Sequence, residues 1–102
     1  MVAVSEFGRS ACANARGGSD HSGAGLAMLL GGLVAGGRII GQWSDSDTEE
    51  GPRADAVEIA TDLRAIFKGL LIDHLKVPVQ RVESIIFPGS AAIAPLPRLI
   101  TA

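Results

Sequence analysis

The stretch TDLRAIFKGLLIDHLKVP, residues 61–78, contains the clearest periodic pattern in the chain. Apolar residues recur there three or four positions apart, as on one face of a helix: Leu63, Ile66, Phe67, Leu70, Leu71 and Leu75. Thr61 is a good N-cap, and Asp62 places negative charge in the first turn. Lys76 adds positive charge at the far end, and Pro78 prevents continuation. We therefore expect an amphipathic helix over residues 62–75 that packs one face on the strands.

The polar residues of this helix predict its outer face. Arg64, Lys68 and Asp73 are expected to point into solvent. His74 lies next to the apolar stripe near the helix end, where a structural or dipole-facing role is favoured over catalysis.

Upstream of the helix, three short apolar runs read as strands. VAVSEF (residues 2–7) looks like a buried strand, LAMLLGG (26–32) is an apolar run bounded by glycine, and RIIGQW (38–43) is the third candidate. Residues 8–20 are rich in small residues without periodicity and are expected to form a loop. The fold class is thus α/β, with about three strands and one main helix.

The remaining segments are less regular. We expect a helical turn over 80–83, an extended piece over 85–87, and an irregular surface tail. Its anchors would be Ile93, Leu96, Leu99 and Ile100. The acidic run 44–55 reads as a solvated loop, since its spacing does not fit the calcium-loop pattern.

Composition excludes several classes of protein. With 102 residues, the chain has room for one domain and one modest core. Nine scattered basic residues and a net charge of −2 give nucleic-acid binding little support. The uncharged stretch 22–37 is shorter than the roughly 20 apolar residues of a membrane span, and Met1 is not followed by a basic signal-peptide region. The chain therefore reads as soluble and cytoplasmic.

The lone Cys12 has no partner for an internal disulfide and reads as a small buried or loop residue.

Two groups of residues could carry chemistry. Glu6 ends an apolar strand, where α/β folds gather their ligands, so it is a candidate metal ligand or general base. The alternative for Glu6 is a salt bridge to Arg9. In GGSDHSGAG (17–25), Asp20 and His21 are both good ligands for zinc or manganese, and the glycines allow close approach to the backbone. Adjacent residues of an extended segment point in opposite directions, so only one of the two is expected to face a given ion.

The order of these motifs resembles a known bacterial family. SEFGR (5–9), GGSDHSGAG (17–25), GGRIIGQW (36–43), ATDLRAIFKGLLIDHLKVP (60–78) and IIFPGSAAIAPLPRLI (85–100) are similar to the motifs of the family called domain of unknown function 1501. The resemblance covers essentially the whole chain. It implies membership of the alkaline-phosphatase-like superfamily, with the sulfatases and phosphoglycerate mutases. Residues 1–102 would form the C-terminal portion of one such domain.

The resemblance also implies a site. Members of that superfamily bind one or two divalent metals at strand ends, here zinc, manganese or calcium. His21 looks like their later histidine ligand, Glu6 stands at the strand-end position, and Asp20 is a second ligand or orients the imidazole. Arg9 would bind the anion or support the ligands. The implied substrate is a small sulfate or phosphate ester.

Two departures qualify the functional expectation. Glu6-Phe7 stands where working superfamily members have Asp-His, and their nucleophile lies upstream of the matching region. We therefore expect a hydrolase part that is inactive by itself. The alternatives are a non-catalytic exported binding or scaffold protein and a truncated gene product. Full-length relatives often carry a twin-arginine export signal. The sheet of such a fragment would have one uncovered face and one uncovered edge, which predicts self-association.

Overall fold

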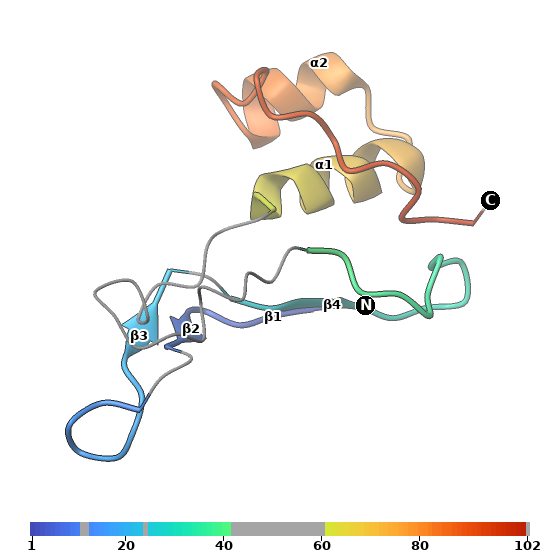
Figure 1. The fold of residues 1–102 in the computed structure, drawn as a ribbon. Helices are drawn as coiled ribbons and strands as arrows, with labels where there is room; N and C mark the ends of the chain where they lie inside the picture. Colours follow the sequence, from blue (N-terminus) through green and yellow to red (C-terminus); the bar gives the residue numbers. More distant parts are fainter. Residues whose placement is uncertain (11–12, 24, 42–60, 102) are drawn as a thin grey trace. The chain divides into compact units, whose positions relative to one another are not determined.

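The computed structural model describes residues 1–10, 13–23, 25–41 and 61–101. Two compact units are present: Met1–Leu29 with Ile39–Ala60, and Leu30–Arg38 with Thr61–Ala102. Short strands dominate the first half, and helices lie in the second (Figure 1). The elements in chain order are β1 (Val2–Val4), β2 (Gly8–Arg9), β3 (His21–Ser22), β4 (Ala27–Leu29), α1 (Leu63–Asp73), α2 (Val79–Arg81) and the π-helical turn η2 (Val82–Ile86). A mixed α/β chain is thereby confirmed, while its membership of one domain stays a prediction.

The first two expected strands pair with each other. β1 and β4 are antiparallel, in a register that places Val2 opposite Leu29 and Val4 opposite Ala27. Ser5 extends the pairing, because its N–H donates to Leu26 O (2.9 Å) and its Oγ accepts from Leu26 N–H (2.8 Å). The expectation that the first strand is buried is wrong, since all three residues of β1 are exposed. A ribbon of two strands has no second layer of its own to cover its faces.

A second pair of strands joins the two ends of the segment 8–20, which the sequence predicted as a loop. β2 and β3 are antiparallel, with Gly8 opposite Ser22 and Arg9 opposite His21. Strands of two residues are too short to show a period of two in the sequence, so pattern reasoning could not find them.

The third predicted strand is wrong over residues 38–41, which form no strand. Gly37 and Gly41 have φ values of 73° and 149°, and these turns interrupt the extended run on both sides. Arg38 instead donates through its guanidinium to the carbonyls of Ala35 (3.1 Å) and Arg98. Residues 42 and 43, like Cys12 and the acidic run 44–55, lie outside the described residues.

The main helix is confirmed, with its boundaries shifted by one or two residues. Asp62, and not the predicted Thr61, is the N-cap, because its carboxylate accepts from the N–H of Arg64 at 2.8 Å. The Arg64 guanidinium reaches back to the same carboxylate (2.8 Å). This hydrogen bond, with that from the Arg64 backbone, holds the pKa of Asp62 below its ordinary value. At the other end, His74 is the C-cap and Lys76 adopts a φ of 55°.

The buried face of α1 differs from the predicted one. Ala65, Lys68 and Gly69 are buried, whereas Leu63 and Leu75 at the ends of the apolar stripe are exposed. The expectation that Lys68 points into solvent is therefore wrong: its side chain is fully buried. The reason lies in the C-terminal segment, which supplies acceptors for the ammonium.

Lys68 Nζ makes three short hydrogen bonds to the segment that follows α1. It donates to Glu83 Oε1 (2.9 Å), Ser90 O (2.9 Å) and Ile93 O (2.8 Å). These acceptors match the three N–H bonds of an ammonium group, so the buried charge is paired and solvated by protein.

Downstream of α1, a helical turn is confirmed and an extended piece is not. Residues 80–83 fall within α2 and η2, but Ile85 and Ile86, predicted as extended, belong to η2. The N–H of Phe87 donates to Val82 O at 2.8 Å, which closes the wide π turn.

The irregular tail runs along α1 (Figure 1). Leu96 N–H donates to Ala65 O at 2.8 Å, and a Cβ at Gly69 would lie 2.3 Å from Leu96 O, so only glycine permits this approach. The predicted anchors are confirmed, since Leu99 is buried and Ile93, Leu96 and Ile100 are half-buried. Ile100 also bridges to Val34.

Replacement of Lys68 by methionine tests the buried ammonium. Lys68→Met removes the donor and leaves the carbonyls of Ser90 and Ile93 without it, so we expect a loss of about 2–3 kcal/mol in the free energy of unfolding. Urea titration followed by circular dichroism measures it. Lys76→Met, at an exposed lysine just beyond the C-cap of α1, is the control and should change stability by less than about 0.5 kcal/mol. Equal stabilities of the two variants would contradict the structure.

Asp62→Asn tests the charge at the cap. The asparagine keeps an oxygen acceptor but cannot ionise. Because the folded-state pKa of Asp62 is lowered, its carboxylate stabilises the fold above the unfolded pKa of about 3.9, and this contribution disappears as pH falls through the folded pKa. The wild type should exceed the variant in stability at pH 7 by a small, salt-screened amount, and the difference should vanish in acid. If the difference in the free energy of unfolding grew towards low pH, the pKa of Asp62 would be raised by folding and not lowered, which would contradict the structure.

Candidate functional site

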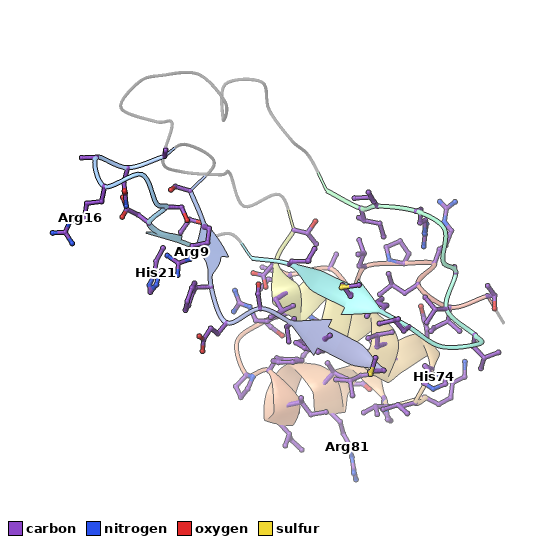
Figure 2. The ribbon with its side chains drawn as sticks, turned by 90° about the horizontal axis from the view of Figure 1, so that it is seen from below. Arg9, Arg16, His21, His74 and Arg81 are labelled. Atoms are coloured by element: carbon purple, nitrogen blue, oxygen red, sulfur yellow. The ribbon has the colours of Figure 1, made fainter. Side chains whose placement is uncertain are left out.

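The predicted site residues lie in the first unit, around the β2–β3 pair. Arg9 on β2 and His21 on β3 are register partners, so their side chains emerge on the same face. Figure 2 shows the two side by side, with Arg16 on the loop beyond them.

His21 is exposed and held by an aromatic contact. Its imidazole stacks on the ring of Phe7, with centroids 3.9 Å apart and an interplanar angle of 22°. Among the described residues, no side chain or backbone group hydrogen-bonds to the His21 nitrogens. Both nitrogens are therefore available to a ligand, either as a metal donor or, when protonated, as hydrogen-bond donors.

Arg9 supports the same face. Its Cζ lies 5.3 Å from the centroid of the Phe7 ring, and its Nη1 donates to Ser19 O at 2.9 Å. The alternative reading of Glu6, a salt bridge to Arg9, is not seen: the two form no ion pair in the structure. One guanidinium edge is thus used to hold the loop, while the charge stays at the surface next to His21.

Asp20 is fixed by the loop that precedes β3. Its carboxylate accepts from Asn14 Nδ2 at 3.0 Å. Its backbone is held by Ser10, whose N–H donates to Asp20 O (2.9 Å) and whose Oγ accepts from Asp20 N–H (3.0 Å). Since successive residues of an extended backbone alternate in direction, the Asp20 carboxylate and the imidazole of His21 belong to opposite faces of the hairpin.

Asn14 is the organising residue that sequence reasoning missed. Its Oδ1 accepts from the N–H groups of Arg16 and Gly18, both at 3.0 Å, while Gly17 takes a φ of 77°. The signal was present in the sequence, because an asparagine shortly before a glycine pair favours such side-chain-to-backbone turns. Ser10 and Phe7 were missed as well, since their roles depend on which strands pair.

The donors fit a divalent ion in kind, but the described residues do not complete a site. Imidazole nitrogen and carboxylate oxygen are ordinary ligands for zinc and manganese. Within the described part of the chain, however, no group of three or more His, Cys, Asp or Glu side chains comes together in a geometry that could hold a metal. Glu6 is exposed between β1 and β2. His21, Asp20 and Glu6 thus offer a partial set of donors.

The second histidine has a different setting. His74 caps the C-terminal end of α1, where its backbone N–H donates to Leu70 O at 3.0 Å, and it is exposed. Its position is consistent with the structural role that the sequence favoured. None of the helices in the described ranges has the length and hydropathy needed to cross a membrane.

Comparison with known proteins gives a family. Neither the curated proteins nor the solved structures contain a match to this chain. The model of the family described as "Protein of unknown function (DUF1501)" matches residues 1–81, which include β1 to β4, the glycine-rich loop and α1. That region carries four of the five motifs on which the resemblance was based, and the fifth, over residues 85–100, lies beyond it. The chain therefore belongs to the DUF1501 family.

Proposed function

We propose that this chain contributes part of the metal site of a sulfatase- or phosphatase-like ester hydrolase, within the alkaline-phosphatase-like superfamily. The observation that supports the proposal is the exposed His21 imidazole, whose two nitrogens have no hydrogen-bond partner among the described residues and whose ring rests on Phe7. A ligand-ready imidazole beside a surface guanidinium suits a site that takes a cation and an anionic ester together.

The four residues of the proposed site have different tasks. His21 on β3 gives a ring nitrogen to the ion. Glu6, between β1 and β2, is a further carboxylate donor. Asp20, bonded to Asn14 and Ser10, orients the loop that carries His21 and does not ligate alongside it. Arg9 offers positive charge to the ester oxygens. A bound divalent ion would polarise the ester and stabilise charge on the attacking and leaving oxygens.

A non-catalytic role is the second candidate function. The described residues bring together fewer than three metal-donor side chains, and Phe7 follows Glu6 where the superfamily's hydrolases have a histidine after an aspartate. A binding or scaffold protein that keeps the hydrolase fold would show both features.

Metal-dependent stability tests the role of His21. A ligand that binds only the folded state raises the unfolding midpoint. At a ligand concentration of 100 times the dissociation constant, the free energy of unfolding rises by about 2.7 kcal/mol. We expect Zn²⁺ or Mn²⁺ to raise the midpoint of the wild type and to leave His21→Ala unchanged. His74→Ala is the matched control and should respond like the wild type, because His74 is the C-cap of α1 and is not one of the proposed ligands. A shift that persists in His21→Ala and disappears in His74→Ala would place the ion elsewhere.

A turnover assay tests whether this chain is an enzyme by itself. With a partial donor set, we expect no hydrolysis of p-nitrophenyl sulfate or p-nitrophenyl phosphate by the chain, with or without added Zn²⁺ or Mn²⁺. Release of nitrophenolate is followed by absorbance. Hydrolysis that is abolished in His21→Ala would show that the chain is itself an enzyme.

A further inference from the structure

The contact between Phe7 and His21 lies at one end of the β2–β3 pair. Phe7 immediately precedes β2 (Gly8–Arg9) and lies outside the paired residues. Arg9 is the register partner of His21, and Phe7 lies two positions before Arg9 in the chain. The half-buried Phe7 ring stacks there on the imidazole of His21, with ring centroids 3.9 Å apart.

The backbone around the stack is fixed on both sides. Gly8 and Arg9 pair with Ser22 and His21, and Ser10 bonds twice to Asp20. Arg9 reaches across to Ser19 O, which keeps the guanidinium near the Phe7 ring (Figure 2 shows Arg9 beside His21). With both backbones held, the remaining freedom of His21 is rotation of its side chain.

Stacking restricts the rotation of the His21 side chain, because it keeps the imidazole face to face with the Phe7 ring. One face of the imidazole is covered by the Phe7 ring at an angle of 22°, so turning the ring edge-on to Phe7 would break the contact. The lone pair and N–H bonds of an imidazole lie in the ring plane. A stacked ring therefore presents its nitrogens at an edge, where an ion or an oxyanion can approach in that plane without displacing Phe7.

We propose that Phe7 is a positioning residue that presents the edge of His21 to its ligand. The inference rests on the proposed function, since it matters only where His21 ligates. Phe7 itself touches no ligand. It acts by reducing the orientations of the imidazole before the ion arrives, so less side-chain freedom is lost on binding.

Nuclear magnetic resonance of the two histidine rings tests the proposal in the full chain. The metal-free wild type should show the His21 ring protons shifted upfield relative to those of His74, because they lie over the Phe7 ring. In Phe7→Leu this difference should disappear. Titration with Zn²⁺ alone, followed at the His21 signals, should then show about 3- to 10-fold weaker binding in Phe7→Leu. Phe7→Tyr keeps the ring and should restore both the shift and the affinity.

A matched control and the folding state are read from the same samples. Phe87→Leu makes the same change in a second stacked pair, Phe67 with Phe87, and should leave zinc binding at His21 unchanged. Amide signals of residues 8–9 and 21–22 report whether the β2–β3 pair is intact.

The contrary outcomes are distinct. Equal zinc affinity in the wild type and Phe7→Leu would overturn the positioning role, and so would His21 protons that resonate like those of His74. Loss of the β2–β3 amide signals in Phe7→Leu would make Phe7 a folding residue and also overturn it. Wild-type His21 signals that do not respond to Zn²⁺ would instead refute the metal ligation on which the inference rests.

Discussion

The buried ammonium of Lys68 is the interaction on which the helical unit depends. A charge without water is strongly unfavourable unless hydrogen bonds replace its hydration. Lys68 meets this condition only when Glu83, Ser90 and Ile93 converge on Nζ. Placing these acceptors fixes η2, the turn after Phe87 and the start of the tail in one step. The tail can then lie against α1, since Gly69 has no Cβ to meet Leu96 O.

The unit that carries the candidate site is held together differently. Of its described residues, only Ser10 is buried, and the buried Ala65, Lys68, Val82 and Leu99 all belong to the helical unit. Backbone ladders, the Ser5–Leu26 bonds and the Asn14 turn define its shape. Consequently the site geometry is set by hydrogen-bond register and not by core packing. This explains why single polar residues such as Ser10 and Asn14 have so much influence on where Asp20 and His21 lie.

The split of Asp20 from His21 bears directly on function. The two residues are adjacent in a glycine-rich segment and look like a joint ligand pair, but their side chains make different contacts. His21 faces the Phe7–Arg9 side with its nitrogens accessible, while Asp20 secures the loop through Asn14. A site with one accessible imidazole and one nearby guanidinium needs further donors to hold an ion tightly. The hydrolase and scaffold proposals differ in whether such donors complete it.

Local signals in the sequence determined much of the outline. The bounds of α1, the apolar runs of β1 and β4, the anchors of the tail and the motifs of the family could all be read from it. These features depend on residues within a few positions of one another, or on a period that many residues share. Even there, the cap moved from Thr61 to Asp62, because the competition between two adjacent capping residues is settled by the Arg64 contacts.

The tertiary structure decided the features that depend on residues far apart in the sequence. Lys68 reads as a solvent-facing lysine because its acceptors are 15 to 25 residues away, and no local pattern records them. The β2–β3 pair, with two residues in each strand, likewise has no period to read, yet it places His21 opposite Arg9, and His21 stacks on Phe7 beside that pair. The sequence by itself determined which residues could act and where the main helix lies. Only the fold decided which of them are buried, which face one another and which remain accessible, since those properties depend on hydrogen-bond partners distant along the chain.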